Sequence, residues 1–197
     1  MESSIKNQMN TPSHFLMTAT LEKLLPRVPI QRQAFLIGSV APDLPLWLLS
    51  LGGVVYYHLI LGWSLAKSFS LMFDHLYFSN PFWIACHNLL HAPLLLLSGI
   101  ALVWKKRRNI GSIYRWLFWF LLACLFHSLI DIFTHADDGP LLFFPLNWSV
   151  RFYSPISYWD PRYYGQEFSR FELALDSVLL LYLLRKPLCR FAQSLQA

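Results

Sequence analysis

The chain has 197 residues, of which 55% are hydrophobic and only 14% are charged. Soluble domains usually carry about 25% charged residues, so the composition favours a membrane protein over a soluble one. The length fits one domain with a core and argues against two. The net charge of +5 is modest, and many of the basic residues gather in two clusters, 105–108 and 185–190. Such clusters are typical of orientation signals in membrane proteins, and we predict no nucleic-acid partner.

The first part of the chain predicts helices that prolines interrupt. A helix is expected over 11–25, where Thr11 is a suitable N-cap, a proline follows it, and another proline closes the helix. A second helical piece, 30–41, leads to Asp43, which lies between two prolines. Residues 46–73 are mostly apolar and contain several glycines, so they fit either one long tilted span or two shorter pieces.

Two later segments have the length of membrane-spanning helices. Residues 82–104 and 114–134 are each apolar over about 20 residues, which is the length that crosses a bilayer as a helix. The basic run 105–108 between them is expected to face the cytoplasm. Residues 135–170 are rich in proline, tyrosine and tryptophan and are expected to pack over the mouth of the bundle. A short last helix is predicted over 171–188. The predicted fold is therefore all-α, a membrane-embedded bundle of about three to five transmembrane or membrane-associated helices.

Two pairs of polar residues interrupt the apolar spans. His87 and His91 are four residues apart, as are His127 and Asp131, and this spacing places both members of a pair on one face of a helix. Imidazole and carboxylate are usual ligands of zinc and other first-row divalent ions. Because the two spans are consecutive and antiparallel, both pairs are expected near the same, non-cytoplasmic membrane face, around one metal. The alternative is a structural polar cluster, in which a hydrogen bond from His127 satisfies the costly carboxylate of Asp131.

Other polar residues have two interpretations each. His14 lies in the first turn of its helix and Asp43 at the end of another, so each is either a ligand or a cap or turn residue. Asp137 and Asp138 follow the second span. They either supply the catalytic base or are part of a solvated loop. A phosphate could be steered by two arginines of the aromatic segment, Arg151 and Arg162. No nucleophile elbow, P-loop or dinucleotide motif occurs, so the chemistry available is metal activation of water.

Four motifs occur in a familiar order: TPSHF, FLIGSVAPDLP, HNLLHAPL and HSLIDIFTHADDGPLLFFP. This order resembles that of the YdjM-like inner-membrane metal-dependent hydrolases and, more distantly, the all-α zinc-dependent phospholipases C. The resemblance covers roughly residues 11–146, the hydrolase-like core of a single domain, 1–197, in which 147–197 forms the aromatic loop and last helix. It implies metal ligands at His14, Asp43, His87, His91, His127 and Asp131. The implied cofactor is zinc, as one or two ions, or else manganese, and the implied location is the bacterial inner membrane.

The sequence thus predicts a membrane-bound metal-dependent hydrolase that acts on a lipid or other small-molecule ester at the membrane, with a phosphoester first. It identifies no protein partner. Two non-catalytic alternatives stay open. Histidines that ligate haem or a pigment would lie well separated from the carboxylates. An assembly or scaffold subunit would use residues 144–164 as its partner surface and would bind no metal.

Overall fold

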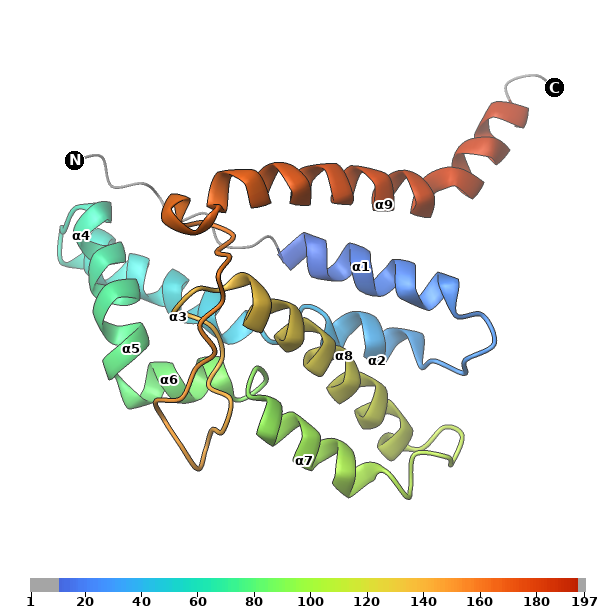
Figure 1. Ribbon diagram of the computed structural model, residues 1–197, viewed down its shortest axis with the longest axis horizontal. Coiled ribbons are helices and arrows are strands. Elements are labelled where there is room, and N and C mark those ends of the chain that lie inside the picture. The colour runs from blue at the N-terminus through green and yellow to red at the C-terminus, as the bar shows by residue number, and fades with distance from the viewer. Residues whose placement is uncertain (1–10, 195–197) are drawn as a thin grey trace.

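The computed structural model describes the backbone of residues 11–194 and the side chains of residues 11–185. Within this range the fold is all-α, as predicted, and the only β-type pairing is an isolated bridge between Leu141 and Arg151. The side chains of Lys186 and Arg190, which belong to the second basic cluster, lie outside the described residues. Figure 1 shows the helices gathered into one bundle, with a long irregular segment crossing one face of it.

The first helices form where the sequence predicts them. Helix α1 spans Thr11–Leu24, α2 spans Arg32–Gly38, and α3 spans Leu44–Gly53 with a proline in its first turn. Helix α2 packs closely on the later helix α8, Ile113–Thr134. A Cβ atom at Gly38 would collide with the backbone carbonyl of Phe120, so this crossing requires glycine.

Residues 46–73 form two helical pieces that fold back on each other. Helix α3 continues into the π-helix η1, Val54–Ile60, and a turn follows in which Gly62 has a φ of +68°. The chain then returns through α4 (Leu65–Ser70), η2 (Leu71–Leu76) and α5 (Tyr77–Ser79). The pieces pack around the buried Leu46, Met72, Tyr77 and Trp83. The second of the two predicted arrangements is therefore the one observed.

Residues 82–104 do not form the one continuous helix that was predicted, because the segment is broken into two helices. Helix α6 spans Pro81–Asn88, α7 spans Pro93–Val103, and the two are bent by 47°. Pro93 disfavours the α conformation of the residue before it, and Ala92 is extended with a ψ of 118°. Asn88 stabilises the break, since its Nδ2 donates to the carbonyl of Ile84 and its Oδ1 accepts from the amide of Leu141.

Helix α8 is the central helix, and it packs against both α2 and α7. Ser112 caps it by accepting a hydrogen bond from the amide of Arg115. The irregular segment after α8 leads through the short 3-10 helix η3, Pro161–Tyr163, into α9, Gly165–Ser194, which packs on α1. The last helix is thus longer than the predicted 171–188.

Fewer helices have membrane-spanning character than the sequence predicts. Among the described residues, α8 alone is long and apolar enough to cross a bilayer as a single helix. The bent pair α6 and α7 passes the same test only if both helices are counted as one span.

Candidate metal centre

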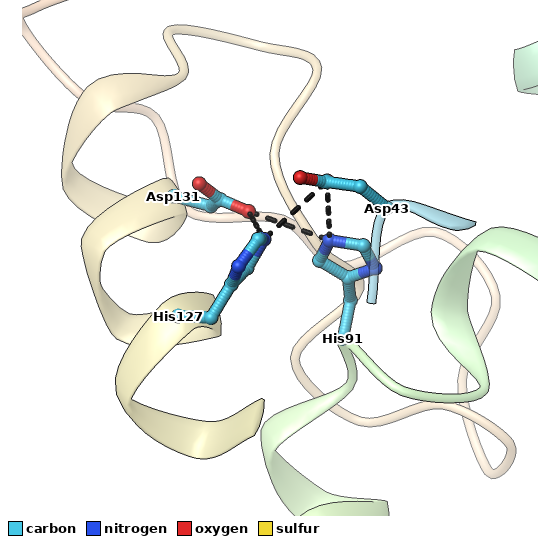
Figure 2. A group of neighbouring side chains, drawn as sticks. All are labelled: Asp43, His91, His127 and Asp131. Atoms are coloured by element: carbon cyan, nitrogen blue, oxygen red, sulfur yellow. Dashed lines mark ion pairs between the residues drawn. The ribbon is translucent and has the colours of Figure 1, made fainter. Parts of the chain in front are cut away.

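Four side chains from three parts of the bundle meet around one point (Figure 2). Asp43 comes from the turn between α2 and α3, His91 from the break between α6 and α7, and His127 and Asp131 from the last turns of α8. One ligand atom of each residue lies within 4.8 Å of the others. Three of these side chains are almost fully buried, namely His91, His127 and Asp131. The Asp43 side chain is 19% exposed.

The two histidines present bare nitrogen atoms to the carboxylates. His127 Nδ1 lies 2.8 Å from the carbonyl oxygen of Ser39, and His91 Nδ1 lies 2.7 Å from that of His87. A carbonyl can only accept, so both Nδ1 atoms carry hydrogen, and in the neutral rings both Nε2 atoms are lone pairs.

These Nε2 atoms face oxygen atoms that also carry lone pairs. His127 Nε2 lies 3.0 Å from Asp131 Oδ2 and 3.4 Å from Asp43 Oδ1, while His91 Nε2 lies 3.4 and 3.6 Å from the same oxygens. Neither Nε2 atom has a hydrogen bond of good geometry. Four acceptors this close, three of them from buried side chains, are stabilised by a cation between them, which is either a shared proton or a metal ion. Two imidazoles and two carboxylates are a donor set that zinc accepts, so the residues fit the predicted metal.

An outer layer of side chains holds the two carboxylates. The hydroxyl of Thr11 donates to Asp43 Oδ2 at 2.5 Å, which leaves Oδ1 for the centre. His14 Nε2 lies 3.1 Å from Asp131 Oδ1, and its ring stacks on His127 with the centroids 3.7 Å apart. Burial lowers the pKa of His14 despite the nearby Asp131, so at pH 7 this ring is neutral and donates through Nε2. His14 therefore lies beside the four-residue group and contacts both Asp131 and His127.

The pKa of Asp43 is also displaced. Burial by itself raises this pKa, but the rings of His127 and His91, which donate to the carboxylate when they are protonated, outweigh burial and hold the pKa well below its usual range. Asp43 is therefore ionised near neutral pH, where it is available as an anionic ligand.

A family model described as zinc dependent phospholipase C matches residues 13–194 of the chain. The chain belongs to this family. No curated protein and no solved structure matches it. Membership and the His/Asp group together identify a metal-dependent hydrolase with a zinc cofactor. The distant resemblance to zinc-dependent phospholipases C is thus confirmed, while the narrower YdjM-like assignment stays a prediction. The haem alternative required histidines well separated from carboxylates, and the structure places them in contact.

His87 lies outside the four-residue group of this phospholipase C family member. Helix α6 ends at Asn88, so His87 and His91 are not on one continuous helix, although their ring centroids lie 4.3 Å apart, as the spacing predicted. The hydroxyl of Tyr77 lies 2.6 Å from the carbonyl of Asp138, to which it must donate, and 2.8 Å from His87 Nε2. His87 Nε2 is therefore a donor to Tyr77, and His87 Nδ1 is a buried acceptor without a hydrogen-bond partner.

A cavity of about 1340 Å³ opens beside the metal group. Asp137, Asp138 and Arg162 line it, as the predicted roles in proton transfer and substrate contact require. Asp137 is exposed, whereas Asp138 accepts from Trp159 Nε1 at 2.9 Å. Arg162 is held by Asp160 at 2.6 Å. Arg151 instead donates to the carbonyl of Gly139 and lies beside the rings of Tyr77 and Phe78.

Sequence reasoning named His14 but missed the rest of the outer layer of this site. Thr11 was interpreted only as an N-cap, and neither Ser39 nor Tyr77 was singled out. Ser39 acts through its backbone carbonyl, which no sequence pattern marks. Tyr77 lies ten residues before His87, a spacing that suggests contact only once the fold-back of α5 on α6 is known.

Proposed function

We propose that the protein is a membrane-bound hydrolase that uses a metal-activated water to cleave a lipid phosphoester. The observation that carries this proposal is the approach of two imidazole Nε2 lone pairs to two carboxylates, at 3.0–3.6 Å, on the floor of a large cavity. When bound by Asp43, His91, His127 and Asp131, zinc supplies a Lewis acid for a phosphoryl oxygen and lowers the pKa of water from 15.7 to about 7.

Asp138 is the better placed of the two candidate bases. Its Oδ2 is fixed by the indole of Trp159, and its Oδ1 is buried with no hydrogen-bond partner while the residue lines the cavity. A carboxylate held in this way can accept a proton from water that enters the cavity. Asp137 is exposed and is the weaker candidate for the base.

Arg162 is the candidate for phosphate contact. Its Nε and Nη2 atoms are both bound to the carboxylate of Asp160, which orients the guanidinium at the cavity and leaves Nη1 available to a phosphate oxygen. Arg151 does not line the cavity, so we assign it no contact with substrate.

The shape of the cavity supports a lipid as the substrate. One wall comes from the folded-back segment and is apolar, with Leu46, Trp47, Leu65, Phe69 and Phe73. This wall suits an acyl chain, while the carboxylates, histidines and Arg162 suit a polar headgroup. The broad apolar surface of the protein and the span-like α8 support a membrane location. We propose the bacterial inner membrane, as the YdjM-like resemblance implies.

The test compares detergent-purified wild type with Asp131→Asn for metal content and for release of diacylglycerol from phospholipid. Asp74→Asn is the matched control, because Asp74 lines the same cavity but lies outside the metal group. We expect about one zinc per chain and activity in wild type and Asp74→Asn, with both lost in Asp131→Asn. Equal metal in all three proteins would refute the site. Wild type without metal after growth in zinc would favour the scaffold alternative.

A further inference from the structure

A second charged region lies at the end of the bundle opposite the metal group. Figure 1 shows that the loop from α1 to α2 and the loop from α7 to α8 lie at the same end, where α8 begins. Arg115 Nη2, in the first turn of α8, donates to the carbonyl of Pro29 at 2.8 Å and joins the start of α8 to the α1–α2 loop. His127 lies about 20 Å further along α8 than Ile113, given a rise of 1.5 Å per residue. The two regions are thus separated by most of the hydrocarbon thickness of a bilayer.

This end of the protein is strongly cationic. Residues 23–32 and 104–115 contain no carboxylate, whereas the cavity end carries most of the acidic residues of the chain. We call these two segments the cationic end, and its basic residues are Lys23, Arg27, Arg32, Lys105, Lys106, Arg107, Arg108 and Arg115. Glu22, at its border, lies 4.0 Å from Arg32. The remaining positive charges far exceed this one carboxylate.

The cations are interleaved with exposed aromatic and aliphatic side chains. The Arg107 guanidinium stacks 3.3 Å over the Trp104 ring, and Lys106 Nζ lies 4.6 Å over the Tyr114 ring. Ile110 is 88% exposed and Leu102 is 83% exposed. A groove of about 510 Å³ is lined by the end of α7 and the residues that follow it, including Leu97, Leu102, Trp104, Lys105 and Lys106.

This combination fits a lipid headgroup region. Phosphates can pair with Lys105 and Arg108, which are exposed, while the apolar side chains beside them enter the boundary between headgroups and acyl chains. A nucleic acid would meet the same cations but would leave Leu102 and Ile110 in water, so it is the poorer match.

We propose that the cationic end binds the phosphates of anionic membrane phospholipids at a site separate from the metal group. The proposal rests on the proposed membrane location and not on hydrolysis. The bound lipid is held about 20 Å or more from His127 along α8, so it is an anchoring lipid and not the one that is cleaved. The metal cavity then faces away from the leaflet that the cationic end binds.

The test measures binding of labelled phosphatidylglycerol and phosphatidylcholine to the full chain in detergent micelles, with EDTA present to prevent turnover. Lys105→Gln combined with Arg108→Gln removes two exposed charges from the cationic end. Lys67→Gln combined with Arg170→Gln removes two exposed charges elsewhere and is the matched control. Each cation near a headgroup changes affinity about fivefold, so we expect the first double variant to bind phosphatidylglycerol about 25-fold more weakly.

The control double variant is expected to bind like wild type, and phosphatidylcholine is expected to bind weakly to all three proteins. A rise in sodium chloride from low to high concentration should weaken phosphatidylglycerol binding to wild type, which tests the proposal even if a variant misfolds. Equal affinity for the two lipids, or equal loss in both double variants, would overturn it. So would tighter binding of an oligonucleotide than of phosphatidylglycerol. Binding that persists in EDTA and in Asp131→Asn separates this site from the hydrolase site.

Discussion

Replacing Thr11 with valine tests whether the outer layer of the metal centre sets zinc affinity. The substitution keeps the size of the side chain but removes the hydroxyl that donates to Asp43 Oδ2 at 2.5 Å. Asp43 would then lose the contact that keeps Oδ1 pointed at His91 and His127. A hydrogen bond to a charged group contributes about 1.5–3 kcal/mol, and loss of an outer-layer partner typically weakens metal binding about 10- to 100-fold. The free energy of the hydrogen bond corresponds to a similar change in affinity, so we expect Thr11→Val to weaken zinc binding about 10- to 100-fold.

The assay is competition for zinc between the purified protein and a chromophoric chelator at pH 7. Thr11→Ser keeps the hydroxyl and is expected to restore most of the affinity. Thr18→Val is the matched control on the same helix, because Thr18 is fully buried and its hydroxyl has no hydrogen-bond partner. Removing that hydroxyl should leave zinc affinity unchanged. If Thr11→Val bound zinc as tightly as wild type while Asp131→Asn did not, the proposed role of Thr11 would be wrong.

Further predictions concern pH and packing. Acidification below neutral pH should release zinc, because protons compete with the ion for the histidine nitrogens. Asp43, whose pKa is lowered, should contribute no step of its own. Zinc release without proton uptake by the histidines would contradict this. Gly38→Ala should destabilise the protein by about 1–3 kcal/mol through its collision with the Phe120 carbonyl. At Gly52 an added Cβ atom meets nothing within 4 Å, so Gly52→Ala should be neutral or slightly stabilising. Thermal denaturation of both variants measures these changes.

The helix-forming segments were largely predictable from local signals. Thr11 and the prolines that follow α1 and precede α3 mark helix boundaries with a known mechanism, and the apolar run of α8 has the length of one helix. The break near His91 was harder to predict, although Pro93 stands in the sequence. A proline in an apolar run can either kink a helix or divide it. The outcome here depends on Asn88, which bonds to Leu141 more than fifty residues later.

The four residues that meet at the metal centre were all among the predicted ligands, and their meeting was predicted for an incomplete reason. The i and i+4 argument holds for His127 and Asp131, which lie in the last turns of one helix. His87 and His91 also lie side by side, with ring centroids 4.3 Å apart, but α6 ends between them and His87 Nε2 is bonded to Tyr77. Both pairs were predicted near the same end of two antiparallel helical segments, and this prediction places His91 correctly beside His127 and Asp131. The long-range contacts of Thr11 and Ser39 follow from tertiary packing and have no local signature.

The interruptions of the helices also explain how the metal centre is built. A helix leaves its last carbonyl groups without intrahelical partners. Ser39 directly follows α2 and His87 is in the last turn of α6, and these two carbonyls accept hydrogen bonds from the Nδ1 atoms of His127 and His91. Each helix end is thereby satisfied by a ligand ring, and each ring is fixed with Nε2 toward the carboxylates. A bundle of uninterrupted helices would satisfy these carbonyls internally and would leave the imidazoles free to adopt the other tautomer. The breaks that divide the helices of this chain are therefore the same features that orient the two imidazoles of its candidate metal centre.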